Sequence, residues 1–228
     1  MRKKIAMAAL SVAAVIGLSA CGRMLDVIGD KSIDSFGRVL ELMKEETREH
    51  PVYGGWSLTS PDGEASFIWS KEDTVSQSFD VLLEVNVQPF LDAGLDVDML
   101  PKGMLAGDKL LLGTDLGSES FSYEGNVTPL ASYEQLVDHY RGSLKYHMAM
   151  DHFGIDLMQG NMFEWAKDMT KNDKDIVYIL DPKPFLAAGV DPQKVEGWVF
   201  GKVMTMDEKG KEIEVEKFLK PFDLDGQQ

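Results

Sequence analysis

Apolar residues recur at helical spacing in the first part of the chain. Ile33, Phe36, Val39 and Met43 lie three or four positions apart, which predicts an amphipathic helix with one buried face. Pro51 is expected to stop this helix, because proline cannot continue a helical hydrogen-bond pattern. The sequence therefore predicts a helix that begins near residue 32.

A second helical pattern appears about a hundred residues later. Ser132 and Gln135 stand three positions apart, as in a capping box. Leu136, Val137 and Leu144 then continue an apolar stripe. The pattern predicts a second helix from Ser132 through Leu144.

Between and after these helices, short runs of alternating residues are bounded by turn-forming Gly, Pro, Asp and Asn, which is typical of antiparallel hairpins. The expected strands are 56–59, 65–69, 80–86, 109–114 and 121–123 in the first half, and 153–158, 162–166, the start of 175–191, 198–206 and 212–218 in the second.

One stretch of the chain occurs twice. Residues 80–96 align without a gap with residues 175–191, and within them 89–96 and 184–191 share six of eight residues. A match this close, with looser matches around it, indicates internal duplication. Each copy is expected to contain a helix, three strands, a short helical turn that begins with proline and ends with glycine, and a hairpin.

This order of elements predicts an α+β fold, a tandem duplication of an approximately 95-residue unit with pseudo-twofold symmetry. The expected divisions are a signal peptide (1–20), a tether (21–31), repeat 1 (32–124), a linker (125–131) and repeat 2 (132–222). Joining the two units would hide sheet edges. The layout is loosely similar to tandem-repeat α/β lipoproteins and to the β-lactamase-inhibitor-like fold, in architecture only.

The N-terminus has the features of a targeting segment. Three basic residues precede an apolar run at 5–18, and Leu18-Ser19-Ala20-Cys21 follows, with the only cysteine in the sequence. These residues resemble the lipobox of bacterial lipoproteins. The resemblance implies that Cys21 is acylated with palmitate-type chains after cleavage and anchors the protein to a membrane on its extracytoplasmic face. Because Gly22 is not aspartate, an outer membrane is possible if the cell has two.

Charge narrows the choice of partners. Removal of residues 1–20 takes away three basic residues and leaves 20 basic and 38 acidic side chains, a formal charge of −18. Such a chain is a poor partner for nucleic acid and is repelled by anionic lipid head groups. The acyl chains at Cys21 are therefore expected to make the contact with the lipid bilayer.

Large aromatic side chains in both copies are candidates for a ligand or partner surface, or for core positions. They are Trp56, Trp69, Phe90, Trp165, Phe185 and Trp198. The shared Pro-Phe-Leu-x-Ala-Gly turn favours a structural role, because its residues are apolar or conformational and carry no reactive group.

The segment His147 to His152 is a weak candidate for a soft metal. If it is extended, Met148, Met150 and His152 point to one face, and thioether with imidazole suits Cu(I). The first copy has no equivalent ligands, and His50 and His147 can simply lie at helix ends. We expect Met148 and Met150 in the core, at least one histidine in solvent, and no bound metal or other cofactor.

The sequence lacks the nucleophile-elbow and phosphate-loop motifs of common enzymes. It therefore favours a non-enzymatic, membrane-anchored lipoprotein that acts as a binding or scaffolding module for an unknown protein or small molecule. The alternatives are a carrier that holds an apolar small ligand between helices and sheets, and soft-metal binding.

Overall fold

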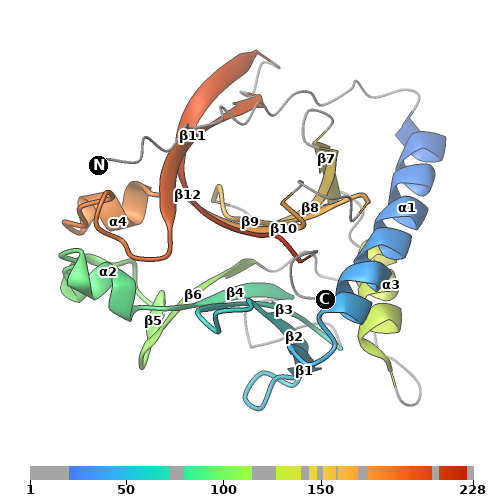
Figure 1. Cartoon of the computed structure of the whole chain (residues 1–228), viewed down its shortest axis with the longest axis horizontal. Coiled ribbons are helices and arrows are strands. Elements are labelled where there is room, and N and C mark those ends of the chain that lie inside the picture. The colour runs from blue at the N-terminus through green and yellow to red at the C-terminus, as the bar shows by residue number, and fades with distance from the viewer. Residues whose placement is uncertain are drawn as a thin grey trace, which may run out of the picture.

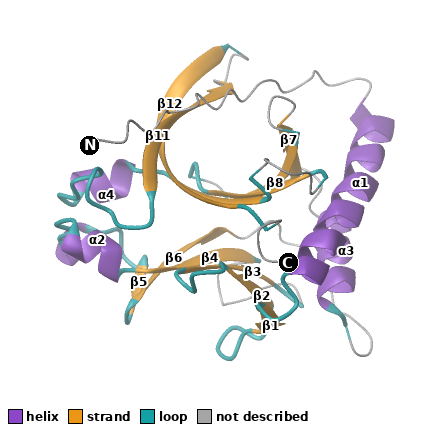
Figure 2. Cartoon of the chain, in the orientation of Figure 1, coloured by secondary structure: helices purple, strands orange, loops and turns teal. Residues whose placement is uncertain are grey.

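The computed structural model describes residues 21–71, 80–114, 127–139, 144–147, 151–157, 159–168, 174–206 and 211–224. Within them the protein is α+β, with two six-stranded antiparallel sheets and four α-helices (Figures 1 and 2). The two sheets lie face to face, so each has an inner face toward the other and an outer face.

The first sheet has the strand order β1-β2-β3-β4-β6-β5. Its strands are β1 (Thr47–Glu49), β2 (Trp56–Thr59), β3 (Ala65–Trp69), β4 (Val81–Asn86), β5 (Leu105–Ala106) and β6 (Lys109–Thr114). The second sheet has the order β7-β8-β9-β10-β12-β11. Its strands are β7 (Leu144–His147), β8 (His152–Asp156), β9 (Met162–Ala166), β10 (Ile176–Leu180), β11 (Val199–Met206) and β12 (Glu212–Phe222).

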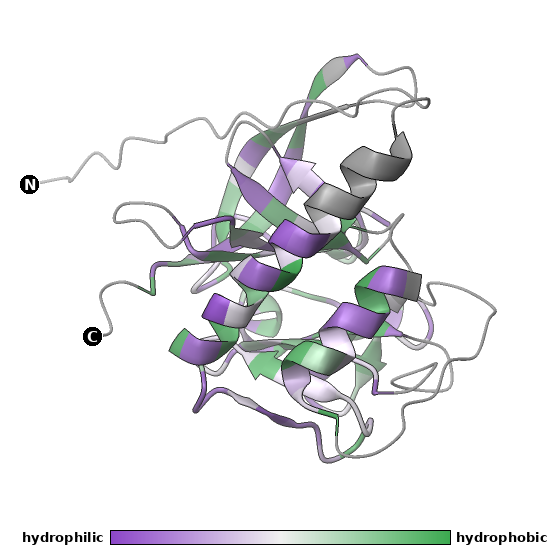
Figure 3. Ribbon diagram, turned by 90° about the vertical axis from the view of Figure 1, so that its right-hand side faces the viewer, coloured by the Kyte–Doolittle hydropathy of each residue, from purple (hydrophilic) through white to green (hydrophobic). Residues whose placement is uncertain are grey.

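Two pairs of helices close the sides of this body. The long helices α1 (Cys21–Leu42) and α3 (Pro129–His139) lie together on one side (Figures 1 and 3). The short helices α2 (Gln88–Asp92) and α4 (Lys183–Ala187) lie together on the other, and a 3-10 turn, η1 (Val97–Met99), follows α2. In the described part of the chain, no helix combines the length and the apolar character that crossing a membrane requires.

The two sheets have the same order and the same connections. Each begins with a long helix and four antiparallel strands, continues through a short helix and ends with two further strands. The predicted α+β class with antiparallel sheets is confirmed, and the likeness of the two sheet units is consistent with duplication.

Aromatic rings from both sheets share one core. Phe67 on β3 stacks on Phe163 of β9, with ring centroids 4.5 Å apart and planes 4° apart. Phe36 of α1 packs 5.1 Å from Trp165 of the second sheet and 5.5 Å from Trp69 of the first. All five side chains are fully buried. Because alternate strand residues point inward, the same strands leave their polar residues on the outer faces.

The short helices meet through a second aromatic stack. Phe90 on α2 and Phe185 on α4 are fully buried, with centroids 4.7 Å apart. In both helices proline stands in the first turn, where its missing N–H costs nothing.

Backbone hydrogen bonds then join the two helix ends reciprocally. The Asp96 N–H donates to the Ala188 carbonyl at 2.8 Å, and the Asp191 N–H donates to the Ala93 carbonyl at 2.8 Å.

Two glycines make this close approach possible. Gly94 has φ +100° and Gly189 has φ +89°, in the left-handed region that side chains other than glycine rarely adopt. A Cβ added at Gly94 would lie 3.2 Å from the Gly189 carbonyl oxygen, and one at Gly189 would lie 3.3 Å from that of Gly94. Glycine is therefore favoured at both positions by the positive φ and by the short distance to the opposite carbonyl oxygen.

The helix boundaries differ from those predicted. α1 begins at Cys21, so residues 21–31, predicted to be a tether, are helical. It also ends at Leu42, well before Pro51, because the chain turns into β1. The Thr47 hydroxyl donates to the Met43 carbonyl at 2.7 Å across that turn, and β1 then pairs with β2.

The start of α3 lies inside the predicted linker. It begins at Pro129, and the Thr128 hydroxyl accepts a hydrogen bond from the Ala131 N–H at 3.2 Å as a cap. The Ser132 hydroxyl, predicted to cap the helix, donates to the buried Ser70 carbonyl at 2.7 Å. Leu144, predicted to be helical, begins strand β7.

Each sheet also has one strand more than predicted before its short helix, namely β1 and β7. In the first sheet, β6 forms its hairpin with β5, at Leu105 and Ala106. Residues 121–123, the predicted partner, lie outside the described residues.

We expect Phe185→Ala to destabilise the fold by about 3–5 kcal/mol, because it removes a fully buried ring from the α2–α4 stack. Urea unfolding measures the loss. Leu186→Ala is the matched control, since Leu186 is 38% exposed and should cost about 1 kcal/mol or less. A near-neutral result at Phe185 would contradict its core position.

We expect Gly94→Ala to destabilise more than Gly103→Ala. Both glycines have positive φ, but nothing lies within 4 Å of a Cβ at Gly103. The control therefore measures the backbone cost of about 1–2 kcal/mol, and the excess at Gly94 measures the contact with Gly189. Equal unfolding free energies for the two variants would mean that this contact does not hold the halves together.

Candidate functional site

Most of the aromatic residues proposed as a ligand or partner surface are core residues. Trp69, Phe90, Trp165 and Phe185 are fully buried. Their rings pack on one another and on neighbouring rings between the sheets. The surface interpretation of these four residues is therefore wrong. Trp69 and Trp165 occupy inward-pointing strand positions, and Phe90 and Phe185 stack on each other between the two short helices.

The other two tryptophans lie near lysines. Trp198 is 7% exposed, and the Lys220 ammonium lies 5.4 Å from its ring centroid. Trp56 is partly exposed, with the Lys71 ammonium 4.6 Å from its ring. These are cation–π distances. Trp56 alone among the six stays a candidate for an exposed surface.

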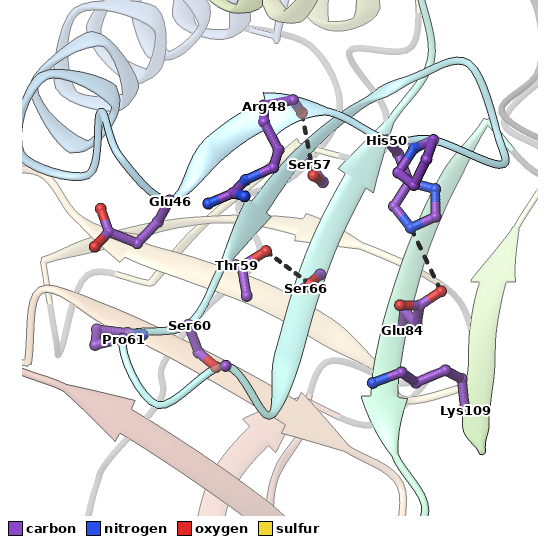
Figure 4. Close-up of a pocket in the computed structure, with 12 residues that line it drawn as sticks. Glu46, Arg48, His50, Ser57, Thr59, Ser60, Pro61, Ser66, Glu84 and Lys109 are labelled. Atoms are coloured by element: carbon purple, nitrogen blue, oxygen red, sulfur yellow. Dashed lines mark hydrogen bonds and ion pairs between the residues drawn. The ribbon is translucent and has the colours of Figure 1, made fainter.

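A polar hollow lies on the outer face of the first sheet (Figure 4). Its volume is ≈ 450 Å³, within the range of small-molecule sites. The lining residues come from β1 to β4, β6 and the turns between them, and they are Glu46, Arg48, His50, Pro51, Ser57, Thr59, Ser60, Pro61, Gly63, Ser66, Glu84 and Lys109.

Small hydroxyl residues of β2 and β3 line the middle of the hollow. Ser57 and Thr59 alternate with the inward-facing Leu58, and Ser66 stands opposite Thr59 across the strand pair. The Ser57 hydroxyl donates to the Arg48 carbonyl at 3.1 Å, and the Thr59 and Ser66 hydroxyls share a hydrogen bond of 3.0 Å. A hydroxyl has three hydrogen-bonding positions, so the partly exposed Thr59 and Ser66 keep capacity for a ligand, whereas Ser57 is buried.

Charged side chains surround these hydroxyls. His50 Nε2 lies 3.6 Å from a Glu84 carboxylate oxygen, and His50 Nδ1 accepts from the N–H groups of Val52 and Tyr53. The two backbone N–H groups therefore orient the imidazole, with Nε2 toward Glu84. Lys109 lies at the other side of Glu84 (Figure 4).

A second polar cluster lies on the outer face of the second sheet. His147 on β7 and His152 on β8 are direct partners across their hairpin, and Glu164 on β9 lies beside them. His147 Nδ1 is 2.8 Å from Glu164 Oε1, and His152 Nδ1 is 3.7 Å from Glu164 Oε2. The side chains of His152 and Glu164 are 2% exposed and that of His147 is 15% exposed.

These contacts correct two predictions. His147 lies on a strand and not at a helix end, and both histidines are largely buried, whereas at least one was expected in solvent. Sequence spacing could not show this, because the carboxylate that brings both imidazoles together comes from another strand.

The charges of this cluster are coupled. Burial disfavours the charged form of Glu164, but its interactions with His147 and His152 outweigh burial and lower the pKa of Glu164. Burial likewise disfavours the imidazolium of His147, but Glu164 raises the pKa of His147. The 2.8 Å contact is therefore a buried ion pair whenever His147 is protonated.

Gly154 makes room for the buried carboxylate. It stands opposite Glu164 in the β8–β9 register. A Cβ there would lie 3.0 Å from Glu164 Cγ and 3.2 Å from Met162 Sδ.

Among the described residues, no group of three or more His, Cys, Asp and Glu side chains is arranged to hold a metal ion. Met148 and Met150 lie outside the described residues, so the soft-metal hypothesis stays a prediction.

The polar hollow and Glu164 were both missed by sequence reasoning. Ser57, Thr59 and Ser66 at alternate strand positions signal an outward polar face, but their grouping with Lys109 depends on strand order. Comparisons of the chain with family models, with curated proteins and with solved structures find no significant match.

We expect Glu164→Gln to cost roughly 3 kcal/mol at mildly acid pH, because it breaks a buried ion pair. The lowered pKa of Glu164 means that the pair's contribution is present above its ordinary pKa of 4.5 and is lost as pH falls further. The raised pKa of His147 means that its contribution is full below 6.5 and is lost as pH rises through the raised value.

Urea unfolding from about pH 3 to about pH 9 tests this expectation, with the difference between parent and variant largest in the middle of that range. Glu84→Gln is the matched control, since its contact with His50 is longer and more exposed and should contribute about 0–1 kcal/mol. A pH-independent difference between parent and Glu164→Gln would rule out the ion pair.

Proposed function

We propose that the protein is a membrane-anchored, extracytoplasmic lipoprotein that acts as a non-enzymatic binding module. The anchoring part rests on Leu18-Ser19-Ala20-Cys21, which resembles a lipobox, and on the basic and apolar segment before it. Acyl chains on Cys21 are the contact with the lipid bilayer.

We further infer that the folded body is a tandem duplication with pseudo-twofold symmetry. Residue correspondence at an offset of 95 relates Ala93 to Ala188 and Asp96 to Asp191, and these residues exchange equivalent hydrogen bonds. The same symmetry relates Phe67 to Phe163, because Phe67 pairs with Leu83 and Phe163 with Tyr178, which is 95 positions later.

The observation that carries the binding role is the hollow on the outer face of the first sheet. It is lined by hydroxyls and by charges of both signs, on a sheet whose inner face is packed into a rigid core. Ligand sites of this kind are fixed surfaces with a few polar groups that orient the ligand. We place the ligand here rather than between the sheets, where the rings fill the interior by stacking on one another.

Hydrogen bonding in the hollow supports binding over catalysis. A nucleophilic hydroxyl needs a general base within hydrogen-bond reach. Ser57 donates to a backbone carbonyl, and Thr59 and Ser66 bond to each other. The Ser60 hydroxyl donates to Asp62 Oδ1 at 2.6 Å, but partial burial of Asp62 is outweighed by its pairing with the Lys220 ammonium, which lowers the pKa of this carboxyl and makes it a weak base. His50 is directed at Glu84 instead.

We expect Cys21→Ser to release the protein from the membrane fraction into the soluble extracytoplasmic fraction. The serine cannot accept the thioether-linked acyl chains, and the acidic body has no attraction to anionic lipid. Fractionation followed by immunoblotting measures the release, and mass spectrometry of the parent detects the acyl chains.

Ser19→Thr in the same segment is a control that should leave the cysteine modified and the protein in the membrane fraction. If Cys21→Ser stays as firmly bound as the parent, another element anchors the protein, and both the lipidation and the localisation proposals fail.

A further inference from the structure

The cations of the polar hollow have no carboxylate partner among the described residues. Six lysines elsewhere have one, namely Lys71, Lys167, Lys194, Lys202, Lys217 and Lys220, and other described cations such as Lys44 and Lys102 have none in the described part of the chain. Arg48 and Lys109 differ from Lys44 and Lys102 in that both line one hollow. Arg48 donates only to the backbone carbonyl of Glu45, at 2.8 Å, and no carboxylate of the described chain lies within 4 Å of Arg48 or Lys109. In a protein this acidic, two unpaired cations facing one hollow indicate an anionic group on the ligand.

Two carboxylates limit how much negative charge that ligand carries. Glu46 and Glu84 line the same hollow as Arg48 and Lys109, so the four charges cancel. A dianion would be repelled by the carboxylates, and an uncharged ligand would leave the cations unused. A ligand with a single negative charge and several hydrogen-bond donors suits both the cations and the carboxylates of the hollow, because Glu84 can accept hydrogen bonds from ligand hydroxyls.

The hydroxyl groups between the charges indicate the rest of the ligand. Ser57, Thr59 and Ser66 offer small, polar side chains across two neighbouring strands, and Ser60 and Pro61 close one end (Figure 4). Such a surface matches a ring that carries many hydroxyl or amide groups.

We propose that the hollow binds a carboxylated sugar, a polyhydroxylated ring with one carboxylate. Arg48 and Lys109 bind the carboxylate, the hydroxyls of Thr59 and Ser66 bind the ring, and Glu84 accepts hydrogen bonds from the hydroxyls of the ring. This ligand class rests on the proposed binding function. It also suits an extracytoplasmic position, where the polysaccharides of a cell envelope are within reach.

Isothermal titration of the full-length chain with N-acetylmuramic acid tests the proposal, and N-acetylglucosamine is the neutral analogue that lacks the lactyl carboxylate. We expect saturable 1:1 binding of the acid and about tenfold weaker binding of the neutral sugar. Lys109→Gln and Arg48→Gln should each weaken binding of the acid about tenfold and leave the neutral sugar nearly unchanged.

Lys102→Gln is the matched control, because Lys102 is an exposed lysine outside the hollow. Ser66→Ala should weaken both sugars to a similar extent, since it removes a hydroxyl and no charge. Urea unfolding of each variant confirms that the fold is intact.

Three results would overturn the proposal: no saturable binding of N-acetylmuramic acid, equal affinity for the neutral sugar, or unchanged affinity in both Lys109→Gln and Arg48→Gln. If glucuronic acid binds as tightly as N-acetylmuramic acid, the result supports carboxylated sugars as the ligand class. It then shows that the hollow is not specific for the muramic sugar. The titration does not depend on acylation. A negative titration would therefore overturn the ligand proposal alone, and a negative Cys21→Ser fractionation would overturn the anchoring proposal alone.

Discussion

Two glycines determine how the halves of this protein meet. Gly94 and Gly189 let two backbone turns approach until each N–H that follows reaches a carbonyl of the other half. A methyl group at either position would meet the opposite carbonyl oxygen at a distance that ordinary packing avoids. Phe90 and Phe185 stack directly beside this contact, and the shared core between the sheets continues from there. The facing arrangement of the sheets, and hence the two outer faces, depends on this approach.

Local sequence patterns predicted many of the elements. β2, β3 and the two short helices follow from alternation and from proline and glycine at fixed positions. The strands β1 and β7 were missed because they are three and four residues long and are formed by pairing with a neighbour. Thr128 and Pro129 show the same limit at the start of α3: they form a good cap and first turn, but Ser132 offers an equally plausible signal three residues later.

The polar sites were less predictable than the fold because they depend on strand order. His147 and His152 are close in sequence, but the residue that contacts both is Glu164. Glu164 lies on the next strand, β9, after the turn that follows β8. Lys109 reaches the hollow because β6 pairs with β4, which lies next to β3 in the sheet. Periodicity identifies which face a residue occupies, while the neighbours on that face come from the register of the whole sheet.

The position of helix α1 bears on how the protein would be oriented at a membrane. The helix has 22 residues, about 33 Å at the helical rise, and it starts at the residue proposed to carry the lipid. Its first turns lie at the level of the second sheet and its last turns at the first (Figure 1). A lipid on Cys21 would therefore keep the second sheet nearer to the bilayer and place the hollow of the first sheet on the side of the body away from the membrane, where the proposed ligand could reach it.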